Sequence, residues 1–120
     1  MTALKKVAGN SIQIQSDKAD MLIMQGDNNA KAQTAFLSLY KRYKDPIFYK
    51  ALLCVKHNKE VASDLTQEIF SKLFEKRMQY TPTFAFSTWL YKMAYNHIVD
   101  YKRQEKFEVA RAEERRGGRE

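Results

Sequence analysis

The amino-acid sequence predicts an all-α protein, built as a compact bundle of three to five helices. Glycine and proline are rare, with four and two copies in 120 residues, so the tight turns on which sheets depend are scarce. Almost no cluster of turn-forming residues interrupts residues 30–104. Apolar side chains recur there at steps of three and four, which is the period of one helix face. Together these features favour long helices.

The N-terminal part of the chain predicts an arm and then a short helix. Residues 1–19 are polar and have no helical period, so we expect a flexible arm there. Asp20 can cap a helix over residues 21–25, and Gly26 would end it. The helical domain is therefore expected to cover residues 20–104.

Two helical stretches follow, separated by a proline. The first begins near Ala30, and its apolar positions fall on one face: Phe36, Leu39, Tyr40 and Tyr43. Asp45 and Pro46 then have the form of an N-cap and a first-turn proline. The second stretch covers residues 47–56 and is expected to turn three residues inward: Ala51, Leu52 and Val55. The sequence leaves open whether the joint is a kink or a true break.

The third predicted helix covers residues 61–76. Its apolar side consists of Leu65, Ile69 and Leu73. Residues 77–85 follow it, with no helical period and with Pro82 in their middle. This is the only long internal loop in the sequence, and long loops in compact domains are usually functional.

The last predicted helix has the most regular pattern. Its apolar positions repeat without a miss over four turns: Phe86, Trp89, Leu90, Met93, Ala94, His97, Ile98 and Tyr101. From Gln104 onward the chain consists mostly of Glu, Arg and Ala. We expect residues 105–120 to form a solvated helical extension or an interdomain linker.

The charge and the cysteine content narrow the class of protein. The net charge is +7 and the pI about 9.5, a balance that favours nucleic acid or an acidic partner. The single cysteine, Cys54, cannot form an internal disulfide, which suits a reducing cytoplasm. It lies in an apolar run and is expected to be a small buried core residue. No signal peptide and no membrane-length apolar segment is visible, so we predict a cytoplasmic protein with no membrane partner.

Catalytic chemistry has little support in the sequence. There is no glycine-rich phosphate loop and no nucleophile motif, and the two histidines, His57 and His97, are far apart. Asp64 and Glu68 lie one turn apart, as paired carboxylates can, but a solvated helix face explains them equally well. His97 has a core-facing position and is interpreted as a packed boundary residue, not as a metal ligand. We expect no enzyme activity, no cofactor and no metal site.

Two surfaces have features of binding sites. The outer side of the third helix is polar and partly acidic, with Asp64, Gln67, Glu68, Ser71, Lys72 and Glu75. Taken alone, this is an ordinary solvated face. The loop and the last helix instead combine basic groups with six aromatic residues within sixteen positions: Tyr80, Phe84, Phe86, Trp89, Tyr91 and Tyr95.

This aromatic and basic segment has the composition of a surface that binds single strands. Lys92, Asn96 and Arg103 project together from the last helix, away from its apolar stripe. Cations that follow phosphates, beside rings that take unstacked bases, hold single-stranded nucleic acid in many proteins. The alternative is that the rings belong to the core and the cations face solvent, which we prefer for Phe86 and Trp89. The choice stays open for Tyr80, Phe84 and Tyr91.

Three segments in this order resemble region 2 of the sigma-70 family of RNA polymerase sigma factors, in particular its extracytoplasmic-function (ECF) group. They are residues 62–70 (ASDLTQEIF), 86–96 (FSTWLYKMAYN) and 100–103 (DYKR). Upstream, the pairs at 26–27 (GD) and 35–36 (AF) also resemble the first helix of that group. The resemblance extends from Asp20 to Arg103, about 70 % of the 120 residues.

The resemblance implies a helical domain that binds the clamp helices of the largest subunit of core RNA polymerase. In the family, the exposed side of a D-x-x-Q-E helix makes this contact. The motif falls here on Asp64, Gln67 and Glu68, with Lys72 as an expected neighbour.

The resemblance also implies binding of promoter DNA. In such factors the loop before the last helix captures a base flipped from the non-template strand of the minus-ten element, and the last helix contacts the same element. Capture of a base stabilises melted DNA by on the order of a few kcal/mol. The expected DNA-binding residues are Arg77, Tyr80, Phe84, Lys92, Asn96, Lys102 and Arg103.

The predicted function is that of a transcription initiation factor domain that binds core RNA polymerase and recognises and melts the minus-ten element. An anti-sigma factor is a further expected partner. Full factors of the group also carry region 4, a second helical domain that nothing after Arg103 supplies, so the sequence fits a single domain of a longer factor or a truncated protein. Two other interpretations stay open: a helical nucleic-acid-binding module and a protein adaptor, neither of which engages polymerase.

Overall fold

The computed structural model describes the backbone of residues 2–117 and the side chains of residues 11–114. It confirms the predicted all-α fold, with no strand among the described residues. The elements are α1 (Thr2–Met24), α2 (Asn29–Cys54), α3 (Lys59–Glu75), the short 3-10 helix η1 (Arg77–Gln79) and α4 (Phe86–Gly117).

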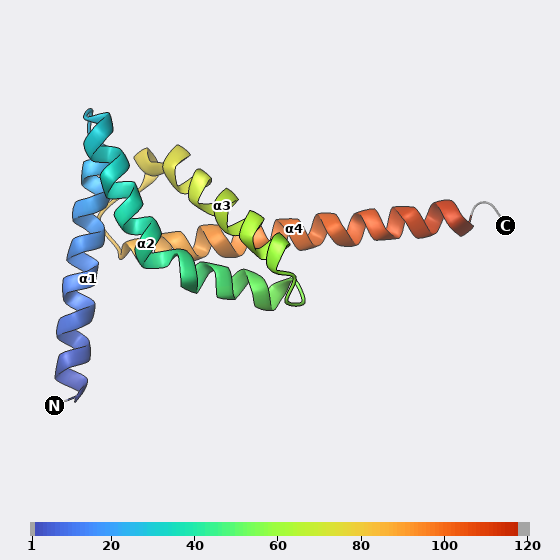
Figure 1. Ribbon diagram of the computed structural model, residues 1–120, viewed down its shortest axis with the longest axis horizontal. Helices are drawn as coiled ribbons and strands as arrows, with labels where there is room; N and C mark the ends of the chain where they lie inside the picture. Colours follow the sequence, from blue (N-terminus) through green and yellow to red (C-terminus); the bar gives the residue numbers. More distant parts are fainter. Residues whose placement is uncertain (1, 118–120) are drawn as a thin grey trace.

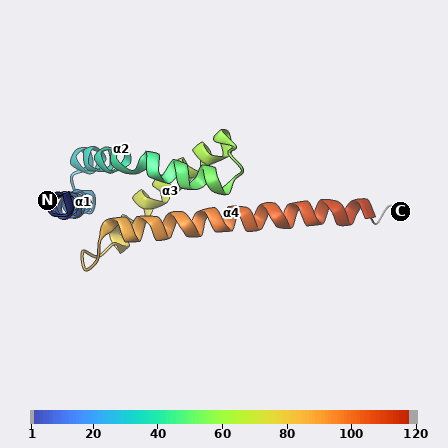
Figure 2. The ribbon, with the colours of Figure 1, turned by 90° about the horizontal axis from the view of Figure 1, so that it is seen from below.

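The helices form a bundle from which the outer parts of α1 and α4 project. Helices α1 and α2 pack side by side in opposite directions, and α3 returns along α2 (Figure 1). In Figure 2, α2 and α4 lie on opposite sides of the bundle and α3 crosses between them. The N-terminal part of α1 and the C-terminal part of α4 extend beyond it, and the molecule measures 64 × 41 × 25 Å. The packed region is therefore built from the other parts of these two helices together with α2 and α3.

Apolar residues from every α-helix form the core. The largest fully buried apolar side chains are Met21, Met24, Leu39, Ile47, Ile69, Leu73, Phe86 and Leu90. The predicted inward positions of α3 are confirmed, because Leu65, Ile69 and Leu73 are all buried. Burial of a Leu or Ile side chain contributes about 1.5–3 kcal/mol. The spacing of apolar residues thus decides how α3 is oriented and which of its faces remains outside.

The structure corrects the prediction for residues 1–19, where no helix was expected. Helix α1 starts at Thr2 and runs without interruption to Met24. Asp17, Met21 and Met24 are all buried, at positions one and two helical turns apart. The inward face of α1 therefore includes a carboxylate, and a pattern based on apolar residues does not detect it.

Partners on α2 explain why Asp17 is buried. The Tyr43 hydroxyl and the Arg42 guanidinium each donate a hydrogen bond to its carboxylate at 2.5 Å. Arg42 also reaches Asp20 at 3.3 Å, and Gln13 donates to the Tyr43 hydroxyl at 3.1 Å. Burial raises the pKa of the Asp17 carboxyl and of the Tyr43 hydroxyl above their ordinary values. The network ties α1 to α2 and positions the C-terminal end of α1.

The joint at Pro46 is not a break, because α2 is one helix with the proline inside it. Figure 1 shows α2 bending part-way along its length. A proline inside a helix removes one backbone hydrogen bond and commonly bends the helix.

Helix α2 begins at Asn29, near the predicted start at Ala30, whereas α3 begins at Lys59, two residues before the predicted start. Asn28 Oδ1 accepts a hydrogen bond from the Lys31 amide at 3.0 Å, and Asn58 Oδ1 accepts one from the Val61 amide at 3.2 Å. Asparagine is a preferred N-cap, so these two side chains explain where the helices begin.

The expectation of a buried Cys54 is wrong, since this residue is exposed. Ala51 is fully buried and Leu52 is half-buried, as predicted, whereas Leu53 is 71 % exposed. An apolar run at the end of a helix has an inner and an outer side, and the helical period turns residue 54 outward.

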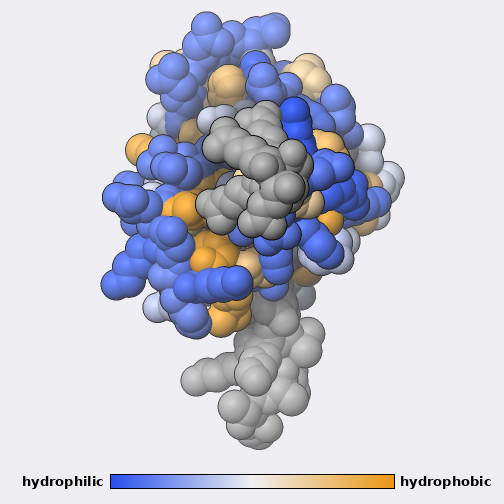
Figure 3. All heavy atoms as spheres, turned by 90° about the vertical axis from the view of Figure 1, so that its right-hand side faces the viewer, coloured by the Kyte–Doolittle hydropathy of each residue, from blue (hydrophilic) through white to orange (hydrophobic). Residues whose placement is uncertain are grey.

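Neither predicted domain boundary coincides with a helix end. Helix α1 runs through residues 19 and 20, and α4 runs through residues 104 and 105 to Gly117. The side chains of residues 102–114 are exposed, including Phe107 and Val109. Figure 3 views the molecule from the side on which α4 projects and shows mostly hydrophilic residues with smaller apolar patches. In the described part of the chain, no helix has the length and apolar character needed to span a membrane.

Candidate functional site

A shallow polar hollow lies on the outer side of α3. The core-facing residues of α3 turn inward, so Asp64, Gln67 and Glu68 project outward and are exposed. These three residues line the hollow together with Ser71, Lys72 and His97. The structure therefore brings together the four residues that the sequence assigned to polymerase binding.

A hydrogen bond between α3 and α4 limits one side of this α3 hollow. His97 Nε2 and Glu68 Oε1 are 2.6 Å apart, and the His97 side chain is only 15 % exposed. His97 thus lies packed at the boundary of the core, as predicted. Its contact with Glu68 was not predicted, because 29 residues separate the two and only the packing of α4 on α3 joins them.

A second hollow, the α3–α4 hollow, lies between the end of α3 and the start of α4. It is lined by Lys72, Lys76, Gln79, Trp89, Lys92, Met93, Asn96, His97 and Asp100. Three lysines against one aspartate give this hollow a positive charge, and Trp89 gives it an aromatic wall. Lysines attract phosphates and an aromatic face can stack on a base, so the lining suits a single-stranded nucleic acid.

The two hollows are adjacent, because Lys72 and His97 line both of them. Sequence reasoning assigned Lys72 to the α3 hollow alone and did not identify Lys76 or Gln79. Lys76 lies one helical turn after Lys72, so a pattern in the sequence does point to it. Gln79 lies in η1, and only the tertiary structure places that segment beside α4.

The predicted DNA-binding residues of α4 fall into two pairs. Lys92 and Asn96 line the α3–α4 hollow. Lys102 and Arg103 are exposed further along α4 and do not line it. At 1.5 Å per residue, Arg103 lies about 10 Å beyond Asn96 along the helix axis. A strand that leaves the hollow along α4 would pass these two cations.

The predicted loop residues have different positions. Phe84 is 43 % exposed, but Tyr80 is only 3 % exposed and Arg77 is half-buried. The Tyr80 ring packs against Trp89 with centroids 5.4 Å apart, and its hydroxyl donates to the Phe84 carbonyl at 3.0 Å. Burial raises the pKa of the Tyr80 hydroxyl. Tyr80 and Arg77 therefore shape the loop, whereas Phe84 faces solvent.

Trp89 was expected in the core, and the structure corrects this in part. Phe86 is fully buried as expected, but Trp89 is half-buried. One side of Trp89 packs on Phe86 and Tyr80, and the residue also lines the α3–α4 hollow. Tyr91, whose place was left open, is half-buried, with Lys50 Nζ 5.0 Å from its ring centroid. The bundle thus covers only part of the apolar face of α4, and Trp89 lies at the edge of the covered part.

These surfaces lie in a part of the chain whose sequence matches a known family. The family described as Sigma-70 region 2 matches residues 39–108, which is more than half of the chain. The chain belongs to the sigma-70 region 2 family. No curated protein and no solved structure matches it.

The sigma-70 region 2 match includes all residues that line the two hollows, but not α1 or the first part of α2. Membership implies a sigma-factor role, that is, binding of RNA polymerase and recognition of promoter DNA. The family is one of transcription initiation factors and not of catalytic enzymes. Among the described residues, no three His, Cys, Asp or Glu side chains are grouped as a metal site would need.

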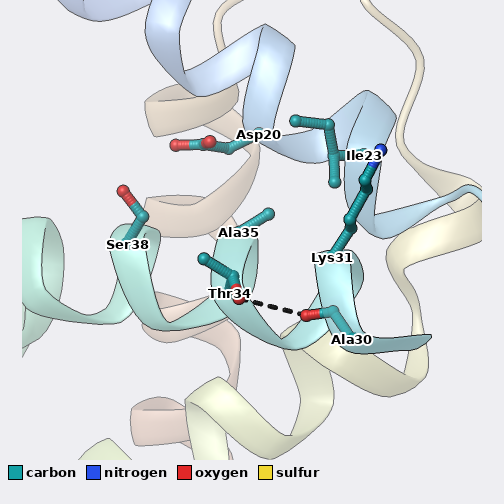
Figure 4. Close-up of a pocket in the computed structure, with 7 residues that line it drawn as sticks. All are labelled: Asp20, Ile23, Ala30, Lys31, Thr34, Ala35 and Ser38. Carbon is teal, nitrogen blue, oxygen red and sulfur yellow. Dashed lines mark hydrogen bonds between the residues drawn. The ribbon is translucent and has the colours of Figure 1, made fainter. Parts of the chain in front are cut away.

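A further hollow, between the end of α1 and the start of α2, lies outside the sigma-70 region 2 match. Figure 4 shows its lining, which includes Asp20, Ile23, Lys31 and Ser38. Every residue that lines it precedes residue 39, so it is separate from the two hollows described above.

Proposed function

We propose that this sigma-70 region 2 domain is of the ECF type and opens promoters by binding polymerase and DNA on adjacent surfaces. In this proposal, the α3 hollow binds the clamp helices of the largest subunit of core polymerase. The α3–α4 hollow holds the melted non-template strand of the minus-ten element. The observation that carries the proposal is that two hollows of different charge lie side by side and share Lys72 and His97 in their linings.

The chemistry of the α3 hollow supports a protein partner there. Asp64 and Glu68 are carboxylates and would repel phosphate, but they suit a basic protein surface, because complementary charge steers association and fixes register. They stand on one helix with buried neighbours on its other side, so little ordering is needed when a partner binds. The hydrogen bond to His97 further limits the conformations of Glu68.

The chemistry of the α3–α4 hollow supports a DNA strand there. Lys72, Lys76 and Lys92 can contact successive phosphates, and Trp89 or the exposed Phe84 can stack on an unpaired base. Lys102 and Arg103 would follow the strand along α4. A base that is bound outside the duplex lowers the free energy of melted DNA relative to paired DNA. Binding of this kind opens a promoter without enzyme activity or a cofactor, and we expect an anti-sigma factor to regulate it by covering the same surfaces.

The first experiment measures binding of the chain to core RNA polymerase. The test variant is Asp64→Ala, Gln67→Ala, Glu68→Ala. The matched control is Gln104→Ala, Glu108→Ala, Glu113→Ala, which removes the same number of carboxylates and amides from the exposed part of α4. We expect the affinity of the test variant to fall about 100-fold or more, as when the centre of an interface is removed, and the control to bind like wild type.

Two other results would contradict the proposal. Wild-type protein that is folded but does not bind polymerase would favour a nucleic-acid-binding module or a protein adaptor. Equal loss of binding in the test and control variants would mean that net charge, and not the α3 hollow, determines the affinity.

A further inference from the structure

The loop between α3 and α4 is connected to the end of α1 through Gln25. The Gln25 side-chain amide donates one hydrogen bond to the Arg77 carbonyl at 2.7 Å and one to the Tyr80 carbonyl at 2.9 Å. A primary amide has two N–H donors, so both are used. The two carbonyls belong to the first residue of η1 and the residue after its end, so Gln25 spans this short helix.

Arg77 makes the return connection to α1. Its Nε donates to the Met24 carbonyl at 2.8 Å, and one of its terminal nitrogens donates to the Phe74 carbonyl at 2.8 Å. Its guanidinium also lies 4.1 Å from the centroid of the Phe74 ring. Met24 is the last residue of α1, where backbone carbonyls lack partners within the helix. We call these contacts of Gln25 and Arg77 the Gln25–Arg77 clasp.

Few other backbone interactions hold this loop. Within the described residues, the Tyr80 amide donates a backbone hydrogen bond to the Arg77 carbonyl at 3.3 Å. The next backbone–backbone hydrogen bond along the chain is the one that the Trp89 amide donates to the Ala85 carbonyl. Between these two, side chains must fix the path of the chain. Tyr80 does so by packing on Trp89 and by donating to the Phe84 carbonyl.

The clasp is therefore continuous with the surface that faces DNA in the proposed function. Gln25 holds the Tyr80 carbonyl, Tyr80 packs on Trp89, and Trp89 lines the α3–α4 hollow. The Tyr80 hydroxyl in turn holds the carbonyl of the exposed Phe84. A loop that is already ordered before DNA arrives loses less conformational entropy on binding.

We infer that Gln25 is a positioning residue for promoter opening: it keeps the loop before α4 in the conformation that binds the melted strand. The inference rests on the proposed function of the α3–α4 hollow. Gln25 lies outside the sigma-70 region 2 match, which begins at residue 39. Gln25 does not line the α3 hollow, and its side chain donates to Arg77 and Tyr80, so its loss should spare polymerase binding.

The test compares Gln25→Met with wild type, because methionine keeps the length of the side chain and donates no hydrogen bond. Gln15→Met is the matched control, as Gln15 is an exposed glutamine on α1. The free protein is followed by tryptic cleavage after Arg77 and by acrylamide quenching of Trp89, the single tryptophan. We expect the rate of cleavage and the rate constant of quenching to rise in Gln25→Met at a temperature where circular dichroism shows intact helices. Both should stay unchanged in Gln15→Met.

The functional readouts use polymerase assembled with each full chain. The DNA probe is a fork junction whose single-stranded non-template overhang is randomised over the minus-ten positions, and retention is compared with that by core polymerase alone. We expect Gln25→Met to bind core polymerase like wild type and to retain this DNA about tenfold less well, since two hydrogen bonds that order the loop are lost.

The outcomes separate this inference from the proposed function. If wild type binds polymerase and retains the DNA, and Gln25→Met does both equally well, the positioning role is overturned and the proposed function stands. If Gln25→Met loses polymerase binding to the same extent as DNA retention, the clasp acts on the whole fold and the inference is also wrong. If wild-type protein itself neither binds polymerase nor adds DNA retention, the proposed function fails and the inference fails with it.

Discussion

The outer face of α3 and the loop before α4 were both predicted to bind a partner, but they acquire their shape in different ways. On α3, the burial of Leu65, Ile69 and Leu73 leaves Asp64 and Gln67 outside, and the helix period alone determines this. In the loop, long-range contacts decide which of the residues expected to face DNA are buried and which face solvent. Tyr80 is buried and Phe84 is exposed.

This difference has a physical basis. Within a helix, each side chain direction follows from position and from local backbone hydrogen bonds. In the loop, the direction of Tyr80 depends on Trp89 and on the clasp to Gln25, which is 55 residues away. The assignment of exposed residues from sequence therefore holds for Asp64 and Gln67 on α3 and fails for Tyr80 in the loop, which packs against the core.

The largest expected effect is a difference in stability between substitutions of two aromatic residues of the loop. Tyr80→Ala should lower the free energy of unfolding by about 3–4 kcal/mol, because it leaves a cavity beside Trp89 and Phe86. Phe84→Ala should cost less than about 1 kcal/mol of stability, since Phe84 is 43 % exposed and loses little buried area. Urea unfolding of both variants measures the difference. Similar stability losses would mean that the two rings are not divided between core and surface.

A smaller effect concerns the α3–α4 hollow and the dependence of its DNA affinity on salt concentration. Lys76→Ala should weaken binding of single-stranded DNA by polymerase carrying the domain, and should reduce the slope of log affinity against log salt by about 0.7, the value for one phosphate contact with a single strand. Lys106→Ala, an exposed lysine of the α4 extension, is the control and should keep the slope. An unchanged slope for Lys76→Ala would place the DNA elsewhere.

The smallest expected effect concerns the hydrogen bond that limits the α3 hollow. Glu68→Gln keeps an oxygen that can accept from His97 but removes the charge. Because Glu68 is 58 % exposed, the stability should change by less than about 0.5 kcal/mol, whereas polymerase affinity should fall. Thermal melting and a polymerase titration measure the two quantities. A large loss of stability would mean that the pair holds the bundle together rather than presenting Glu68 to a partner.

Particular residues mark the limit of prediction from sequence. The grouping of Asp64, Gln67, Glu68 and Lys72 could be predicted because they share one helix. The helix before residue 20 could not be predicted from apolar periodicity, since Asp17 occupies one of its buried positions. A buried carboxylate is stable only where donors satisfy it, and those donors come from α2.

By itself the sequence determined the helical class, the inner faces of α3 and α4, and the motifs that resemble a sigma-70 region 2 domain. Each of these depends on residues within a few helical turns of one another. The tertiary structure decided the burial of Asp17, the adjacency of the two hollows at Lys72 and His97, and the clasp from Gln25 to the loop. These features join residues 25 or more positions apart, and hydrogen bonds and packing at such separations exist only once the helices have assembled.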